Sequence, residues 1–218
     1  MSNELLVRTL TGLLLIAAAL AAAAVGHTVF AVVVAAIATA MFYEWTRIVR
    51  GWGPAWYMSG FIYALLPALA LLWIRERTPP DLPNDERGLK LLIWVFVVTW
   101  STDIGAYFAG RRFGRRKLAP SISPGKTVEG LYGGIAAATL IGGAWVLATG
   151  LGRPLLALAP LLAIAAQAGD LFESAMKRRA GVKDSGAWLP GHGGVLDRLD
   201  GLVPVAVLTA LAQLGGLT

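Results

Sequence analysis

The sequence contains no cysteine and only two histidines, which excludes disulfide bridges and thiolate metal sites. It has no HExxH motif, so a zinc site is not favoured either. Charged residues are scarce as well: they make up 15% of the 218 residues, whereas a soluble domain carries about 25%. Hydrophobic residues account for 56% of the chain, and the mean hydropathy is +0.65. This composition predicts an integral membrane protein.

The positive net charge of +6 does not indicate a nucleic-acid-binding protein. The basic residues flank apolar segments, and no surface that combines aromatic and basic residues is present. Membrane topology and contact with anionic lipid head groups explain the charge better. The sequence therefore predicts membrane lipids as partners and no nucleic acid.

The apolar residues form segments close to the ~20 residues that a helix needs to cross a bilayer. The predicted spans are Leu10–Val25, Thr28–Tyr43, Trp56–Ile74, Leu89–Phe108, Val128–Thr149, Pro154–Leu171 and Leu199–Leu217. The first could be a secretory signal peptide, but another apolar segment follows it and the chain never becomes soluble. We therefore expect a retained span.

The predicted fold class is an all-α integral membrane protein, a polytopic bundle of about seven transmembrane helices with a cytoplasm-facing polar site at the membrane interface. No internal repeat stands out, so one structural domain is expected. Within it, residues 1–90 would form an apolar scaffold of N-terminal helices. Residues 91–218 carry nearly all of the unusual polar motifs and would form the catalytic region.

The distribution of basic residues predicts the orientation of the chain. If the N-terminus is cytoplasmic, 14 of the 19 lysines and arginines lie in cytoplasmic segments. The positive-inside rule then places the C-terminus outside and the polar loops 109–127 and 172–198 in the cytoplasm. The expected location is the inner, or cytoplasmic, cell membrane.

Acidic residues near the ends of apolar segments are the first candidates for a functional site. Asp103 lies in or near the fourth span, where an unpaired charge is costly, and this favours a functional role over helix capping or a structural ion pair. Asp170, Ser174 and Lys177 would share one face if the sixth helix continues past its apolar part. An acid, a hydroxyl and a base in one row suit a metal–phosphate site. A solvated helix end with an ordinary ion pair is the open alternative.

Asp197 and Asp200 are spaced as neighbours on one helical face. Two carboxylates this close repel, and one would stay protonated unless a cation lies between or beside them. Hard divalent ions such as Mg²⁺ take carboxylate and phosphate oxygens. The pair therefore predicts Mg²⁺ or a similar hard cation.

Two further polar segments surround these acids. SPGKTVEG contains a Gly-Lys-Thr sequence, but the Walker spacing is missing and no strand is predicted before it, so a P-loop NTPase is rejected. Lys126 at the start of a helix still favours a phosphate. The basic run 111–117 could bind anions or serve only as a topology anchor. The glycines around His192 allow close approach to a ligand, or form merely a tight turn.

The stretch SAMKRRAGVKDSGAWLPGHGGVLDRLD, from Ser174 to Asp200, resembles the signature of the phosphatidate cytidylyltransferases (CDP-diacylglycerol synthases). The signature elements Ser, Lys-Arg, Lys-Asp, Pro or Gly, His-Gly-Gly and Asp-Arg-x-Asp are all present in order at matching spacing. KLAPSISPGKTVEG is similar to the second recurring segment of the family. The resemblance extends from Asp103 to the C-terminus, whereas the first third matches only as apolar helices.

The resemblance implies a nucleotidyltransferase that transfers CMP from CTP to phosphatidic acid and releases CDP-diacylglycerol and pyrophosphate. It implies a requirement for Mg²⁺, allows K⁺ as a second cation, and leads us to expect a homodimer. Two alternatives stay open. One is a CTP-dependent kinase of a polyprenol, dolichol or phytol, and the other is an ion or lipid transporter that uses intramembrane acids.

The resemblance also implies roles for individual residues. The catalytic residues would be Asp170, Lys177, Asp197 and Asp200. The metal ligands would be Asp170, Asp197 and Asp200, with Asp103 as a further candidate. The residues expected to bind the nucleotide or the lipid phosphate are Lys117, Lys126, Ser174, Lys183, Asp184, His192, Gly193, Gly194 and Arg198.

Overall fold

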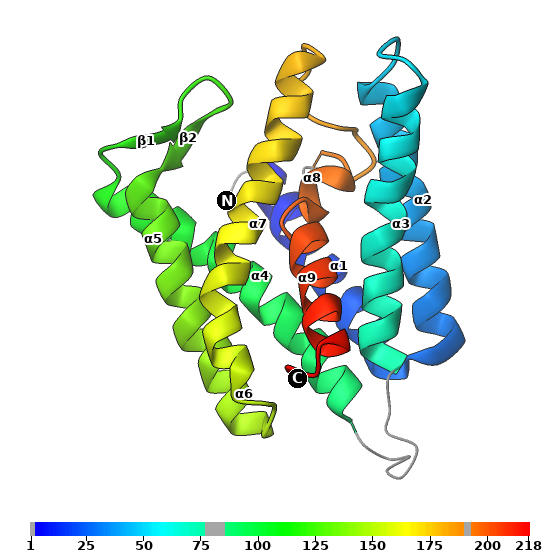
Figure 1. Cartoon of the computed structure of the whole chain (residues 1–218). Helices are drawn as coiled ribbons and strands as arrows, with labels where there is room; N and C mark the ends of the chain where they lie inside the picture. Colours follow the sequence, from blue (N-terminus) through cyan, green and yellow to red (C-terminus); the bar gives the residue numbers. More distant parts are fainter. Residues whose placement is uncertain (1–2, 77–85, 190–192) are drawn as a thin grey trace.

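A computed structural model of the chain describes residues 3–76, 86–189 and 193–218 (Figure 1). Its helices are α1 (Asn3–Val25), α2 (His27–Ile48), α3 (Pro54–Glu76), α4 (Arg87–Phe113), α5 (Val128–Ala137), the π-helical turn η1 (Ala138–Gly142), α6 (Gly143–Thr149), α7 (Pro154–Arg179), α8 (Leu196–Leu199) and α9 (Leu202–Leu214). A two-stranded sheet is formed by β1 (Lys117–Ala119) and β2 (Ser123–Thr127).

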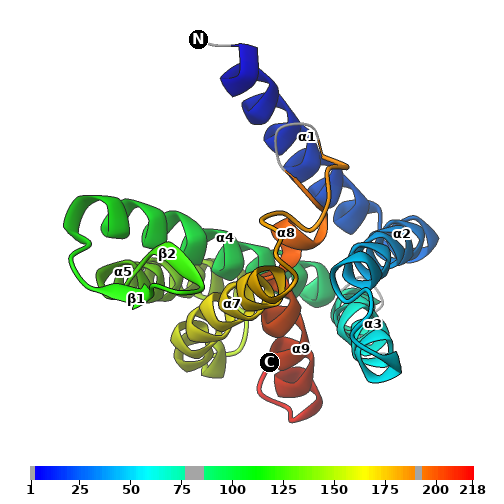
Figure 2. The same cartoon turned by 90° about the horizontal axis from the view of Figure 1, so that it is seen from above.

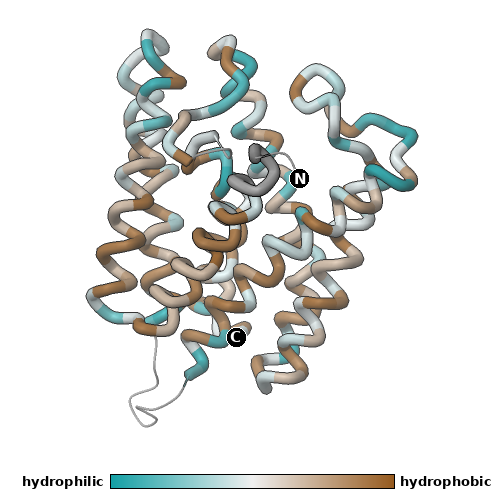
Figure 3. The backbone as a smooth tube through the Cα atoms, turned by 180° about the vertical axis from the view of Figure 1, so that it is seen from behind, coloured by the Kyte–Doolittle hydropathy of each residue, from teal (hydrophilic) through white to brown (hydrophobic). Residues whose placement is uncertain are grey.

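Each predicted apolar segment contains a helix, but the last one, predicted as Leu199–Leu217, is interrupted at Asp200 and Gly201 and ends at Leu214. Among the described residues, five helical stretches are long and apolar enough to cross a membrane, namely α2, α3, α4, the continuous α5–η1–α6 and α7, while Thr9–Val25 and Leu202–Leu214 are shorter apolar helices. Hydrophobic residues fill the middle of the bundle and hydrophilic residues gather at its ends (Figure 3). The predicted class, an all-α polytopic membrane protein, is confirmed.

The ends of the helices differ from the predicted ends in a way that matters for the site. Helix α2 continues to Ile48, and α7 continues to Arg179, well past its apolar part. Polar side chains near these ends therefore project from regular helices and not from loops. The predicted row of Asp170, Ser174 and Lys177 on one helix is confirmed.

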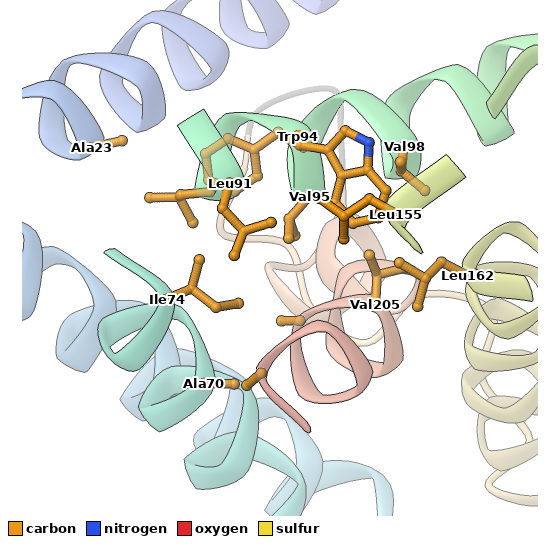
Figure 4. Packing of buried hydrophobic residues seen from close by; sticks show 14 of the residues in the cluster. Ala23, Ala70, Ile74, Leu91, Trp94, Val95, Val98, Leu155, Leu162 and Val205 are labelled. Carbon is orange, nitrogen blue, oxygen red and sulfur yellow. The ribbon is translucent and has the colours of Figure 1, made fainter. Parts of the chain in front are cut away.

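Helix α4 crosses the molecule from its left edge to its middle in Figure 2, and it contacts α1, α3, α5, α7 and α9. Its side chains pack against α3, α7 and α9 in the hydrophobic core (Figure 4). The fully buried indole of Trp94 also donates a hydrogen bond of 3.1 Å to the carbonyl of Gly142, at the end of η1. This hydrogen bond ties α4 to the π-helical turn.

Helices α4 and α5 approach each other closely because small residues line their contact. A Cβ atom on Gly105 would lie 2.6 Å from the carbonyl oxygen of Gly133, and one on Gly134 would lie 2.8 Å from that of Thr102. Small residues allow such backbone contact between membrane helices. This contact fixes the strand pair β1–β2, which connects the two helices, at one end of the bundle.

The strand pair was not predicted, because the segment was interpreted as a loop. β1 and β2 are antiparallel, with Lys117 opposite Thr127 and Ala119 opposite Ser123. Glu129 in the first turn of α5 accepts a hydrogen bond of 3.0 Å from the backbone N–H of Arg115 and so ties the entry of the hairpin to its exit. The hairpin, the C-terminal end of α7 and α8 lie toward the same end of the molecule (Figure 1).

Candidate active site

The first polar cluster joins α4, β2 and α7 around one lysine. Lys126 forms an ion pair with Asp170 (Nζ to Oδ2, 2.8 Å) and donates to Gln167 Oε1 at 2.6 Å. Gln167 Nε2 in turn donates to Asp103 Oδ1 at 3.4 Å, and Ser174 Oγ donates to Asp170 Oδ1 at 3.3 Å. We call these five residues the Lys126 cluster. The structure thus brings together four residues predicted from the sequence.

Local contacts hold Lys126 in this place. Thr127, at the end of β2, caps α5 by accepting a hydrogen bond of 3.0 Å from the N–H of Gly130. Arg178, at the end of α7, donates to the carbonyl of Ile122 in the hairpin turn at 3.2 Å. The hairpin is therefore attached both to α5 and to α7, which carries Asp170.

A second cluster surrounds Lys177, about two helical turns beyond Asp170 on α7. The buried Lys177 ammonium contacts Asp197 Oδ1 at 2.6 Å and Glu173 Oε2 at 2.8 Å. Asp197 Oδ2 also accepts backbone hydrogen bonds from Ser185 at 3.0 Å and from Gly194 at 2.9 Å. We call these five residues the Lys177 cluster. It binds Ser185, Gly194 and Asp197 to the C-terminal part of α7.

Asp197 is held in its charged form by these contacts. Burial by itself would raise its pKa, but the hydrogen bonds from Lys177, Gly194 and Ser185 outweigh burial and lower the pKa to about 2. Both carboxylate oxygens already accept hydrogen bonds in this arrangement. The role of Asp197 as a metal ligand stays a prediction, and the geometry gives the residue an evident function as an anchor.

Asp200, between α8 and α9, lies beside the Lys126 cluster. The backbone of Gly169 packs directly against the carbonyl of Asp200, and a Cβ atom at this glycine would lie 2.9 Å from Pro204. This contact brings Asp200 close to Asp170. Burial and the negative charge of Asp170 raise the pKa of the Asp200 carboxyl, and Asp103 adds further repulsion.

Repulsion among these carboxylates is the condition that a bound cation relieves. No group of three or more acidic or histidine side chains meets closely enough to enclose a metal within residues 3–76, 86–189 and 193–218. Mg²⁺, however, is commonly held by one or two carboxylates together with phosphate oxygens of a substrate. Asp170 and Asp200 are the acids whose mutual repulsion such an ion would relieve, and their role as metal ligands stays a prediction.

An apolar cavity opens onto the same acids. Helices α1 to α4 and α9 line it with side chains that include Phe30, Val34, Ala68, Leu71, Phe96 and Trp100. Asp103, Arg198 and Asp200 are also among its lining residues. The cavity therefore combines a mainly apolar lining with charged groups of both signs.

The remaining predicted residues take several positions. Lys117, Lys183 and Asp184 are exposed to solvent. Gly193 pairs with Leu189 through a hydrogen bond of 3.0 Å between the Leu189 N–H and the Gly193 carbonyl. Gly193 also has a φ of +80°, a conformation that favours glycine. Gly194 is buried, and the prediction for His192 lies outside the described residues.

Three residues of the two clusters and their surroundings were missed or underrated in the sequence: Glu44, Gln167 and Glu173. Glu44 had a usable signal, since an acid at the end of an apolar segment is a functional candidate by the reasoning applied to Asp103. The predicted second span stopped at Tyr43 and so left Glu44 outside it. Glu173 lies two residues beyond the predicted end of the sixth span, and its partner Lys177 is one turn away on the same helix. Gln167 gave no comparable signal, because its partners Lys126 and Asp103 lie on other elements.

The fold and the clusters define a polytopic membrane protein with an acid- and lysine-rich site at one end of its bundle. The sequence profile of the cytidylyltransferase family matches residues 57–214. The chain belongs to this family, and it is an integral membrane enzyme.

The chain is also similar to curated proteins that are named phosphatidate cytidylyltransferase. It is 40% identical to the protein of Brucella suis over an alignment of 239 residues, which covers 86% of this chain and 84% of that protein. It is 42% identical to the Pseudomonas aeruginosa protein over 186 residues, covering 83% and 66% of the two chains. With the Bacillus subtilis protein it shares 51% identity over 119 residues, 53% and 44% of the chains.

Proposed function

We propose that this enzyme transfers CMP from CTP to phosphatidic acid and forms CDP-diacylglycerol and pyrophosphate. A phosphate oxygen of phosphatidic acid attacks the α-phosphorus of CTP, and the bond from this phosphorus to the bridging oxygen of the β-phosphate breaks. Both reactants are anions, so the protein must mainly position them and neutralise charge. The family membership and the names of the similar proteins support this reaction.

The observation that carries the proposal is the mainly apolar cavity whose lining includes Asp103, Arg198 and Asp200, beside the Lys126 cluster. Phosphatidic acid has the matching structure, with hydrocarbon chains attached to an anionic head group. Its acyl chains would remain in an apolar environment while the phosphate lies near Arg198. A water-soluble nucleotide would reach the same acids from the polar end of the bundle.

The polar residues then have separable tasks. Lys126 and Lys177 neutralise phosphate charge, and the hydroxyl of Ser174 donates to a phosphate oxygen. Asp170 and Asp200 hold Mg²⁺, with Asp103 and Asp197 as the further acids of the site. When bound, this ion would neutralise the negative charge that develops on the phosphate oxygens. Lys117, Lys183, Asp184 and the 192–194 segment would contact the nucleotide.

We also propose that the polar end of the bundle faces the cytoplasm, where CTP is available, and that the protein resides in the inner, or cytoplasmic, cell membrane. Most lysines and arginines of the chain lie in segments assigned to this side. The phosphate of phosphatidic acid lies at head-group depth, which is the depth expected for acids at the ends of membrane helices.

The test uses purified protein with phosphatidic acid and CTP labelled either in the α- or in the γ-phosphate. Entry of the α-label into the lipid, with release of pyrophosphate, is the expected result. Transfer of the γ-label to a lipid alcohol would instead identify a CTP-dependent kinase. Ion or lipid flux without nucleotide consumption would identify a transporter.

A further inference from the structure

Glu44 is a fully buried acid that contacts the site from an element far away in the sequence. It projects from α2, and its exposed fraction is 0%. Oε2 accepts hydrogen bonds of 2.8 Å from Ser185 Oγ and from the N–H of Leu196, and Oε1 accepts one of 3.0 Å from the N–H of Val195. All of these donors are, or lie close in sequence to, residues that also donate to Asp197.

Two glycines close to these donors pack directly against the Glu44 carboxylate. A Cβ atom on Gly194 would lie 2.6 Å from Glu44 Oε2, and one on Gly186 would lie 2.8 Å from Glu44 Cδ. Neither position has room for a larger side chain. These residues thus fit around Glu44 both by hydrogen bonding and by shape.

We propose that Glu44 is a positioning residue that holds Ser185, Val195 and Leu196 so that Asp197 meets Lys177. Ser185 is the direct link, because its side chain donates to Glu44 while its backbone N–H donates to Asp197. The effect on catalysis rests on the proposed function. Glu44 lies outside residues 57–214, which match the family profile. The proposal therefore gives α2, which was predicted as part of an apolar scaffold, a role in the site.

The chemistry of the site requires a carboxylate at this position. A carboxylate has acceptors on both oxygens, whereas the amide of glutamine replaces one of them with a donor group. The amide of Glu44→Gln can adopt two orientations. In one, its NH₂ group faces the N–H of Val195, and in the other it faces the donors of Ser185 and Leu196. Either way, one or two buried donors lose their hydrogen-bond acceptor.

The activity test compares Glu44→Gln and Glu44→Asp with the matched control Glu76→Gln. Glu76, the last residue of α3, also accepts a backbone hydrogen bond, from the N–H of His27 at 2.7 Å. We expect kcat/KM per folded molecule to fall about a hundredfold in Glu44→Gln, the loss that a misplacement of about 1 Å causes. Glu44→Asp should recover part of this loss, and Glu76→Gln should keep wild-type kinetics.

A purely structural role of Glu44 gives a different pattern. It would lower the melting temperature or the folded fraction and leave kcat/KM per folded molecule unchanged, and this result would overturn the proposal. If Glu44→Gln does not fold, Ser185→Ala decides instead, since it removes one donor and keeps the carboxylate. Wild-type kinetics in Ser185→Ala would then count against the proposal.

A second test measures the position of the Glu44 partners without any use of activity. The chain has no cysteine, so Leu196→Cys introduces a single reporter at a position that is 1% exposed and donates to Glu44 only through its backbone N–H. Adding Glu44→Gln should accelerate its reaction with a water-soluble maleimide roughly tenfold or more, because the contacts that bury it are lost. Equal rates would refute the positioning role, even if the wild-type enzyme proves to have another substrate.

Discussion

Replacing each of two aspartates by asparagine should separate a catalytic acid from an anchoring acid. Asp170 and Lys126 form an ion pair between side chains that are 31% and 16% exposed. A partly exposed pair of this kind contributes about 0–1 kcal/mol to stability, and Lys126 would keep its bond to Gln167. Asp170→Asn should therefore unfold nearly like the wild-type protein.

The activity of Asp170→Asn should fall much further than its stability. If Asp170 holds the metal ion, a thousandfold lower turnover is expected, which corresponds to about 4 kcal/mol of lost transition-state stabilisation. Asp197→Asn should differ, because its ion pair with Lys177 joins side chains that are 5% and 10% exposed. Breaking a buried pair costs about 3–5 kcal/mol, so this variant should lose both stability and activity.

The assay combines initial rates of CDP-diacylglycerol formation in detergent micelles with thermal unfolding in the same detergent. Arg115→Gln is the control, since this exposed residue is predicted mainly to anchor the topology, and its activity should fall only a few-fold. The reasoning fails for Asp170 if Asp170→Asn retains near-wild-type turnover. It fails for Asp197 if Asp197→Asn unfolds at the wild-type temperature.

Three further predictions concern the ion, the orientation and the assembly. Activity should vanish in EDTA and return with Mg²⁺, because the acids offer only hard oxygen ligands; full activity in the chelator would exclude the proposed metal site. Cysteines introduced singly at the exposed positions Ser121 and Arg153 should react with an impermeant reagent from the cytoplasmic and the outer side, respectively; the opposite result would invert the proposed topology. Mass measurement in detergent should give a homodimer, since alanine- and glycine-rich spans permit close helix packing; a fully active monomer would refute this.

Much of the fold follows from local sequence properties. Length and hydropathy were sufficient to find every apolar helix, and helical spacing was sufficient to align Asp170, Ser174 and Lys177. These features depend on residues close together in the chain. The ends of the helices were less accurate, because polar residues continue α2 and α7 beyond their apolar parts.

The contacts within the site could not be derived in the same way. The pairs Lys126–Asp170 and Lys177–Asp197 depend on how separate elements pack, and nothing in the spacing of the residues selects these partners over others. The resemblance to a family named the participating residues without their contacts. Glu44 escaped notice because the predicted second span ended at Tyr43, whereas α2 continues to Ile48. Its donors, backbone N–H groups and a serine, carry no distinctive sequence signal that would have pointed back to it.

The contacts of Glu44 also have a consequence for the order of folding. Its hydrogen-bond partners lie 141 to 152 residues further along the chain. During synthesis, α2 is complete long before these partners exist, and a buried carboxylate without donors is unfavourable. Until the C-terminal third is made, we therefore expect the C-terminal end of α2, where Glu44 lies, to stay hydrated. Glu44 becomes buried when Ser185, Val195 and Leu196 donate to it. Formation of these site contacts and burial of the C-terminal end of α2 should therefore occur together.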